Sequence, residues 1–423
     1  MLTALMHLLF LICKYAIIYF LVMIISIENF KLKRAKPFIF LCVLSLIFCA
    51  SCSKQNSVKI SETSNVKTIN IGVMEPFTGV YAASAIDEIN GIKLANWLYN
   101  KVTINGKEYN IKLIEADNES TVDGAKKAAE KLVSEKVFAA IGTYDSTLAL
   151  SSINILTNAK IPTMSATSTH PRLTLNNDYS FRICPIDPLI ATIIANYVYK
   201  NGYETAAILT CKTSENSISL SNFFRMAYTK LGGRIVHEQT FNTGDEDFSG
   251  AMDRIKNSGA EFIFAPSAVN DGAKIIDASR KAGLSSKIGA SDTWESAALV
   301  ASSSASAEGA IFASFFNEGS VGTTETTKFN KEAPGYLSFN GFSSTITSNL
   351  ACGYDAYMAI YRALENMDKL DNQELRFRID DLNYDGLTGI IKFDENGDAI
   401  RNTIYMKEII NKRFALLETT NIN

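Results

Sequence analysis

The sequence predicts an α/β fold with two lobes, each built on a doubly wound, mostly parallel sheet. Three observations predict it. Beyond residue 67, short apolar runs alternate with segments of helical periodicity, which is typical of strand–helix–strand units. Residues 52–423 are too many for a single core, which seldom grows beyond about 250–300 residues. Two apolar runs, 137–143 and 161–165, each end in a hydroxyl-rich cluster, as neighbouring parallel strands can at their carboxyl ends.

The individual elements follow from hydrophobic periodicity. Amphipathic stripes such as Val122, Ala125, Ala129 and Leu132 recur at helical spacing between the apolar runs, and a longer helix is expected over residues 349–365. The strands themselves are expected at residues 69–73, 111–115, 137–141, 161–165, 206–210, 234–241, 261–265 and 309–315.

Residues 1–51 are predicted to be a leader. Residues 37–51 have the length of a signal-peptide apolar region and end directly before Cys52. Small residues before a cysteine resemble a bacterial lipoprotein signal, so we expect Cys52 to be lipidated and to anchor the protein to a membrane. Cleavage without lipidation is the alternative. Residues 1–27 are either a membrane span or an upstream extension of the reading frame. Residues 52–67 are polar and predict a flexible tether.

Composition excludes several classes of function. Lys and Arg number 41 against 44 Asp and Glu, and no basic block stands out, so no nucleic-acid partner is expected. Beyond Cys52, the cysteines Cys184, Cys211 and Cys352 are far apart and predict isolated buried thiols, with neither a metal site nor a disulfide. No Walker, GxGxxG or HExxH motif is present, so no cofactor is expected. Ser146 has no evident catalytic base, so we do not expect an enzyme.

The two hydroxyl-rich clusters predict a ligand site. In open parallel sheets, ligands bind beyond the carboxyl ends of the strands. Ser146 stands where a helix N-cap is expected, and Thr169 precedes a helical start. Hydroxyls beside two helix N-termini favour a carboxylate. The residues expected to line this crevice are Tyr144, Ser146, Thr167, Ser168 and Thr169.

Several segments resemble the branched-chain amino-acid type of periplasmic binding protein, the receptor subunit of an ABC importer. They read IGVMEPFTGVYAASAIDEINGIKLA, AIGTYDSTLALSS, IPTMSATSTHPRLT, GGRIVHEQTFNTGDEDFSGAMDRIKNSGAEFIFA and DGLTGIIKFDENGD, in this order along the chain. The resemblance implies the type I periplasmic binding protein fold, in which three crossings join the lobes and the ligand lies between them. It places residues 68–182 and 311–398 in lobe one, and residues 183–310 and 399–423 in lobe two.

The resemblance also implies roles for single residues. Ser146 matches the serine that holds the ligand carboxylate, and Thr169 the threonine that contacts both carboxylate and ammonium. Thr167 would supply a backbone carbonyl, and Asp292 would meet the ammonium from lobe two. Three further positions match less closely: Ser84 at a lid position, Glu215 near a position that is often aromatic, and Ala268 where a large side chain is common. The last two departures indicate a more polar or bulkier ligand than leucine.

Together these features predict an extracytoplasmic, membrane-anchored receptor that binds an amino acid, branched-chain or related. The expected partners are the small-molecule ligand and the permease subunits of an ABC importer, and we expect a monomer. Two alternatives stay open. One is a receptor for an amide or urea-type ligand, and the other is a ligand-sensing lipoprotein that works with a separate signalling partner.

Overall fold

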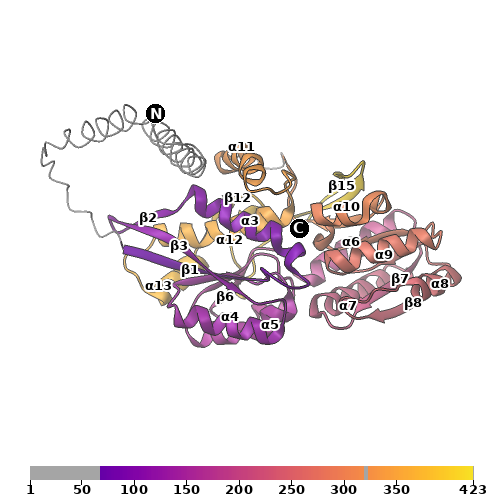
Figure 1. Ribbon diagram of the computed structural model, residues 1–423, viewed down its shortest axis with the longest axis horizontal. Coiled ribbons are helices and arrows are strands. Elements are labelled where there is room, and N and C mark those ends of the chain that lie inside the picture. Colours follow the sequence, from indigo (N-terminus) through magenta and orange to yellow (C-terminus); the bar gives the residue numbers. More distant parts are fainter. Residues whose placement is uncertain (1–66, 319–322, 423) are drawn as a thin grey trace, which may run out of the picture. The chain divides into compact units, whose positions relative to one another are not determined.

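The computed structural model describes residues 67–318 and 323–422. The predicted leader, the lipidation residue Cys52 and all but the last residue of the tether lie outside the described residues. The described chain is organised by two large sheets with helices on both faces (Figure 1). The predicted two-lobe α/β fold class is therefore confirmed.

The first sheet has six strands in the order β2-β3-β1-β4-β5-β6. All neighbouring pairs are parallel except the β2–β3 hairpin, which was not predicted. The strands are β1 (Lys67–Glu75), β2 (Lys101–Ile104), β3 (Lys107–Asp117), β4 (Ala139–Gly142), β5 (Thr163–Ser165) and β6 (Ser180–Arg182). The helices of this lobe are α3 (Ala82–Leu98), α4 (Val122–Ser134), α5 (Ser146–Asn158), η1 (Pro171–Leu173), α11 (Thr324–Phe339), α12 (Ser348–Glu365) and α13 (Asn372–Asp380), with a small hairpin of β12 (Tyr384–Gly386) and β13 (Gly389–Ile391).

The core of lobe one follows from the alternation of side chains along β1. Ile71 belongs to the apolar cluster formed with α3 and α12, whereas Met74 packs in the cluster of α4 and α5 on the opposite face. Helices α3 and α12 approach closely, because a Cβ at Gly91 would lie 2.0 Å from the Leu350 carbonyl oxygen and one at Gly353 would lie 2.2 Å from that of Glu88. Glycine at both positions therefore permits this contact.

The second sheet has seven strands in the order β15-β14-β11-β10-β9-β7-β8. Strands β7 to β11 pair in parallel, while β14 and β15 add an antiparallel edge. The strands are β7 (Thr205–Cys211), β8 (Arg234–Phe241), β9 (Phe262–Phe264), β10 (Lys287–Ala290), β11 (Ile311–Ser314), β14 (Thr403–Ile410) and β15 (Arg413–Asn421). The helices are α6 (Asp187–Lys200), α7 (Glu215–Lys230), α8 (Ser249–Ser258), α9 (Val269–Lys281), η2 (Asp292–Trp294), α10 (Ala297–Ser303) and η3 (Ser304–Ala307).

One predicted lobe boundary is wrong. Residues 311–398 were assigned to lobe one, yet β11 lies between β10 and β14 in the second sheet. The apolar run IFAS forms β11, which pairs with β10 on one side and with β14 on the other. The chain therefore leaves lobe two after residue 314 rather than before residue 311. The pattern of a buried strand predicts that it joins a sheet, but not which of two sheets it joins.

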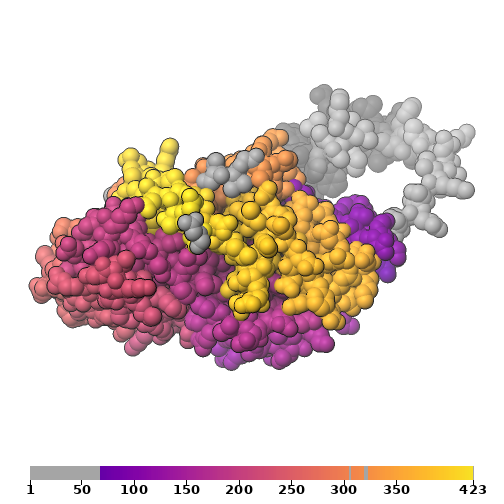
Figure 2. Space-filling model, turned by 180° about the vertical axis from the view of Figure 1, so that it is seen from behind, coloured from indigo at the N-terminus to yellow at the C-terminus, as the bar shows by residue number. Residues whose placement is uncertain are grey.

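Two of the three crossings between the sheets run side by side and are joined by buried arginines. Arg182, with no exposed surface, donates from Nε to Asp398 Oδ1 at 2.8 Å. Arg401 donates from Nε to the Ile183 carbonyl oxygen at 2.6 Å. Seen from behind, the gold and yellow residues near the C-terminus lie against elements of both lobes (Figure 2). These contacts tie the residues next to β6 to those before β14.

Within the described ranges, no helix is both long and apolar enough to cross a bilayer. The three described cysteines, Cys184, Cys211 and Cys352, are free and buried, as predicted.

Candidate functional site

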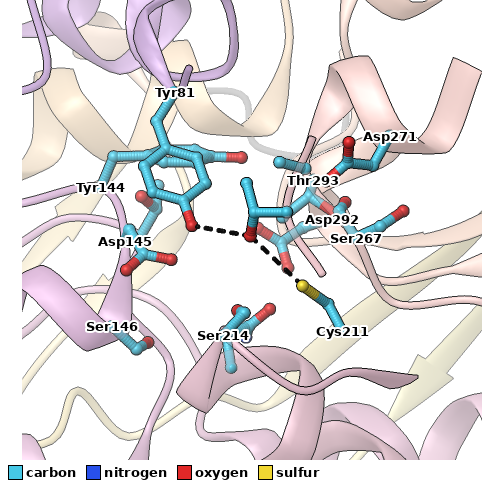
Figure 3. Close-up of a pocket in the computed structure, with 14 residues that line it drawn as sticks. Tyr81, Tyr144, Asp145, Ser146, Cys211, Ser214, Ser267, Asp271, Asp292 and Thr293 are labelled. Carbon is cyan, nitrogen blue, oxygen red and sulfur yellow. Dashed lines mark hydrogen bonds between the residues drawn. The ribbon is translucent and has the colours of Figure 1, made fainter. Parts of the chain in front are cut away.

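A cavity lies where the carboxyl ends of strands from both sheets face each other (Figure 3). About 490 Å³ of space there is not filled by protein atoms, part of it open to solvent. Its wall consists of Tyr81, Tyr144, Asp145, Ser146 and Thr167 from lobe one, and of Cys211, Ser214, Asn216, Thr243, Ser267, Ala268, Asp271, Asp292 and Thr293 from lobe two.

The lobe-one wall is centred on the N-terminus of α5. Ser146 lines the cavity as predicted, is 2% exposed, and its Oγ has no hydrogen-bond partner among the described residues. The predicted capping role of Ser146 is wrong, because the N-cap is Asp145, whose Oδ1 accepts from the backbone N–H of Thr147 at 2.8 Å and Leu148 at 3.1 Å. Asp145 therefore already occupies two of the free N–H groups that were expected to favour a ligand carboxylate.

The lobe-two wall contains Asp292, the first residue of η2, two residues beyond the end of β10. Its side chain points into the cavity from the side opposite Ser146 (Figure 3). Asp292 is 2% exposed, and its Oδ1 has no hydrogen-bond partner in the described chain. The pKa of Asp292 is raised to about 8, chiefly by burial; a backbone hydrogen bond lowers it, and the charges of Asp187 and Glu295 raise it. This carboxyl group therefore favours a proton or a cationic partner.

Tyr144 and Thr167 also line the cavity, and each is positioned by a buried glutamate. The Tyr144 backbone N–H donates to Glu75 Oε2 at 2.8 Å, and the Thr167 hydroxyl donates to the carboxylate of Glu88. Both glutamates have no exposed surface, and Oε1 of each has no hydrogen-bond partner among the described residues. Burial raises the pKa of Glu88 to about 7, and burial together with the charge of Glu88 raises the pKa of Glu75 well above its usual value.

Two predicted crevice residues support the wall without lining it. The Ser168 hydroxyl donates to the Thr143 carbonyl oxygen at 2.5 Å. The Thr169 hydroxyl donates to Asp187 Oδ1 at 2.5 Å and accepts from Asn216 Nδ2 at 2.7 Å. Thr169 thus holds Asn216 in the wall, whereas the resemblance implies direct contact with the ligand. The expected helical start beyond Thr169 is the short helix η1, but its N-cap is His170, whose Nδ1 accepts from the Arg172 N–H.

Ser84 and Glu215 lie between the lobes rather than in the cavity wall. Ser84 Oγ accepts from the Val269 backbone N–H at 3.2 Å, at the start of α9. Glu215 forms an ion pair with Arg172 at 2.9 Å, and its backbone N–H donates to Thr147 Oγ1 at 3.1 Å. Both residues therefore join lobe one to lobe two in this structure.

The sequence reasoning missed most of the lobe-two wall. Cys211 ends β7, while Thr243 and Ser267 follow β8 and β9 within three residues. The rule that located Ser146, polar residues beyond the ends of parallel strands, could have located these residues as well. Asp271 lies in the first turn of α9, where an acidic residue is usual at a helix start and gives no separate signal.

The described residues contain no group of three or more His, Cys, Asp and Glu side chains arranged to hold a metal ion. Cys211 is the only thiol in the cavity wall, and its Sγ lies 3.3 Å from Thr243 Oγ1.

Comparisons with known proteins agree with this geometry. A family model described as periplasmic binding protein matches residues 68–413. The chain belongs to the periplasmic binding protein family. The predicted likeness to the branched-chain amino-acid type is confirmed by a relative of this binding protein, the Leu/Ile/Val-binding protein homolog 3 of Brucella melitensis, which is 28% identical over 198 residues. That alignment covers 46% of this chain and 53% of the relative, so this chain matches about half of the length of the relative.

Solved structures extend the likeness of this periplasmic binding protein over both lobes. The leucine-binding protein LivK from Thermotoga maritima has 28% sequence identity and a TM-score of 0.77, with 84% of this chain and 99% of that chain covered. A solute-binding protein of an ABC transporter from R. palustris, solved with benzoate, has 18% identity and a TM-score of 0.74, covering 83% and 96% of the two chains. The second likeness shows the fold alone.

Proposed function

We propose that this periplasmic binding protein is an extracytoplasmic receptor that holds an amino acid between its two lobes and delivers it to an ABC importer. One observation supports this ligand class most directly. Ser146 Oγ and Asp292 Oδ1 are buried, lie on opposite walls of one cavity, and have no hydrogen-bond partner among the described residues. Buried polar atoms are nearly always paired, so these two atoms, and the Tyr144 hydroxyl that is unpartnered in the same wall, favour a ligand that pairs with them.

The chemistry of the two groups favours a zwitterion. A hydroxyl can donate to a ligand carboxylate, and a carboxylate accepts from a ligand ammonium. Hydrogen bonds to charged groups contribute about 1.5–3 kcal/mol each. A few such bonds, less the cost of ordering the ligand and the lobes, reach the ~8 kcal/mol that corresponds to micromolar affinity. Both charges of the ligand would be met, which is the condition for removing a zwitterion from water.

A ligand held in this way would link the lobes. Ser146 belongs to lobe one and Asp292 to lobe two, so only the closed arrangement satisfies both ends of the ligand. Binding would therefore shift the hinge equilibrium toward closure. In this proposal the closed surface is what the permease subunits recognise, and lipidation at Cys52 keeps the monomeric receptor beside them at the membrane.

The similar proteins support the proposal. The name of the Brucella relative refers to leucine, isoleucine and valine, and that of the Thermotoga structure to leucine. The R. palustris protein was solved with benzoate, which has a carboxylate but no ammonium. Asp292 favours the amino acid over such a ligand, because benzoate offers no ammonium to its buried, unpartnered Oδ1 and would be repelled by the ionised carboxylate.

Ligand-induced stabilisation of the full-length protein tests the proposal. We expect at least one amino acid to raise the melting temperature, because a ligand at about 100 times its Kd stabilises the native state by ~2.7 kcal/mol. Ser146→Ala should lower the affinity for that amino acid about tenfold or more. Ser151→Ala is the matched control on the same helix, since Ser151 Oγ donates only to the Leu148 carbonyl oxygen. Stabilisation by urea, a short amide or benzoate, with none by any amino acid, would overturn the proposal.

A further inference from the structure

The cavity wall has an unusual composition for an aliphatic ligand. Among its fourteen residues, all of them described, Ala268 alone has no polar side-chain atom. No leucine, isoleucine, valine, methionine or phenylalanine is among them. A branched aliphatic side chain would therefore be buried against hydroxyl, thiol, amide and carboxyl groups that lose water and gain no partner. A site built from such groups discriminates strongly against a ligand that cannot pair with them.

The same wall has three carboxyl groups and no cationic side chain. Asp145, Asp271 and Asp292 are 6%, 3% and 2% exposed, while Lys, Arg and His are absent from the fourteen lining residues. The three carboxyl groups differ in how many hydrogen-bond donors the chain supplies to them, and this difference indicates a different role for each.

Asp145 caps α5: its Oδ1 accepts from two backbone N–H groups, and the helix dipole favours its charge. Asp292 would receive the α-ammonium of the ligand. Asp271 is left with one backbone donor, the Gly244 N–H at 3.1 Å from its Oδ1. The cation one helical turn further along, Lys274, forms its ion pair with Glu246 at 2.7 Å. Asp271 therefore has acceptor capacity that the described chain does not use.

We propose that the ligand is an amino acid whose side chain presents N–H donors to Asp271. This inference rests on the proposed function and names the ligand class for the same site. It rests on two independent observations. The first is the acidic wall without a cationic side chain. The second is that Asp292 Oδ1 and Ser146 Oγ are buried and unpartnered, and in the proposed function these two atoms hold the ammonium and carboxylate of the amino acid. N–H donors can come from an amide or from a cationic amine, and the two sources predict different responses to removal of the Asp271 charge.

Two pairs of ligands of matched shape test the proposal by calorimetry on the full-length protein. Asparagine has nearly the shape of leucine, and norleucine is lysine without its terminal ammonium. We expect the N–H-bearing member to bind at least tenfold more tightly than its apolar partner in at least one pair. Leucine and norleucine binding as tightly as asparagine and lysine would overturn the inference.

Asp271→Asn distinguishes the source of the donors. The variant keeps an oxygen that can accept from the Gly244 N–H, so the turn next to α9 is retained. If the ligand side chain is cationic, Asp271→Asn should lower affinity at least tenfold. If it is an amide, Asp271→Asn should change affinity less than about threefold, and only Asp271→Leu should lower it at least tenfold. The apolar ligand of the pair should bind the Asn variant as it binds the wild type. Asp253→Asn, an exposed position on α8, is the matched control.

These outcomes separate the inference from the proposed function. Tight binding of leucine that still depends on Ser146 and Asp292, with no effect of either Asp271 variant, would leave the proposed function standing and refute the N–H-bearing ligand. Failure of every amino acid to bind would refute both.

Discussion

Asp145 and Asp292 face the same cavity from opposite lobes, and both are almost completely buried, yet their surroundings differ. Asp145 accepts two backbone N–H bonds at the start of α5. Asp292 Oδ1 accepts none from the described chain, and burial raises the pKa of Asp292 to about 8. The fold therefore supplies donors to Asp145 Oδ1, whereas it leaves Asp292 Oδ1 without a partner. The difference supports the proposal that Asp292 is a binding group and Asp145 a structural one.

The sharpest test of this comparison is Asp292→Asn. The substitution keeps the shape and removes the charge that would meet a ligand ammonium. We expect affinity to fall about ten- to a hundredfold, which corresponds to ~1.4–2.8 kcal/mol for one charged hydrogen-bonded contact. Titration calorimetry with the tightest amino acid would measure the loss. An unchanged Kd would make Asp292 a buried structural group like Asp145.

The pKa of Asp292 also predicts proton release on binding. With a pKa of about 8 in the empty cavity, the carboxyl group is mostly protonated at pH 7. It must ionise to pair with an ammonium, so binding should release up to one proton, and affinity should rise up to tenfold per pH unit as the pH approaches 8. Calorimetry in two buffers of different ionisation enthalpy measures the released proton. The release should disappear in Asp292→Asn, and its persistence there would assign the proton to another group.

Substitution of Asp145 should affect the stability of the fold more than the affinity for the ligand, the opposite of what is expected for Asp292. Asp145→Ala removes the cap of α5 and should lower the free energy of unfolding by about 1 kcal/mol, within the 0.5–2 kcal/mol typical of N-caps. Asp145→Asn, which can still cap the helix, should lose much less. Denaturant unfolding would measure both variants. If Asp145→Asn weakened ligand binding as strongly as Asp292→Asn does, the two carboxyl groups would share one role.

The smallest effect is expected at Glu215. Its carboxylate pairs with the exposed Arg172, and such surface ion pairs contribute about 0–1 kcal/mol. Glu215→Gln should therefore change affinity less than about threefold, a loss that increased salt should mimic in the wild type. A loss of more than tenfold would instead place Glu215 in contact with the ligand, as the resemblance implied.

The local patterns predicted elements of both lobes. Strand β8 was predicted with its observed bounds, 234–241, and the hydroxyl-rich clusters beyond 137–143 and 161–165 do face a cavity. They were predictable because hydrophobic periodicity and polar residues at strand ends are local features of the chain. Thr169 and Ser168 show the limit of that reasoning. Both residues do follow the end of β5, as predicted. Their hydroxyls, however, donate to the Thr143 carbonyl oxygen and to Asp187 Oδ1, which come from other parts of the chain.

The cap of α5 shows a second limit. Asp145 and Ser146 are both common N-cap residues, and the backbone conformation of Asp145 decides that its side chain caps the helix while Ser146 Oγ stays free. A similar choice placed β11 in the second sheet rather than the first. In each case the sequence offered two options of nearly equal local preference.

By itself, the sequence determined the α/β class and the likeness to branched-chain amino-acid binding proteins, and it pointed to Ser146 and Asp292, which both line the cavity. Only the tertiary structure decided which other residues complete the wall, and it added Asp271 and the buried pair of Glu75 and Glu88. The physical reason is that burial and partnership set the behaviour of a carboxyl group. Asp145, Asp271 and Asp292 look alike in the sequence, and they differ only in which distant N–H groups and charges the fold brings beside each of them.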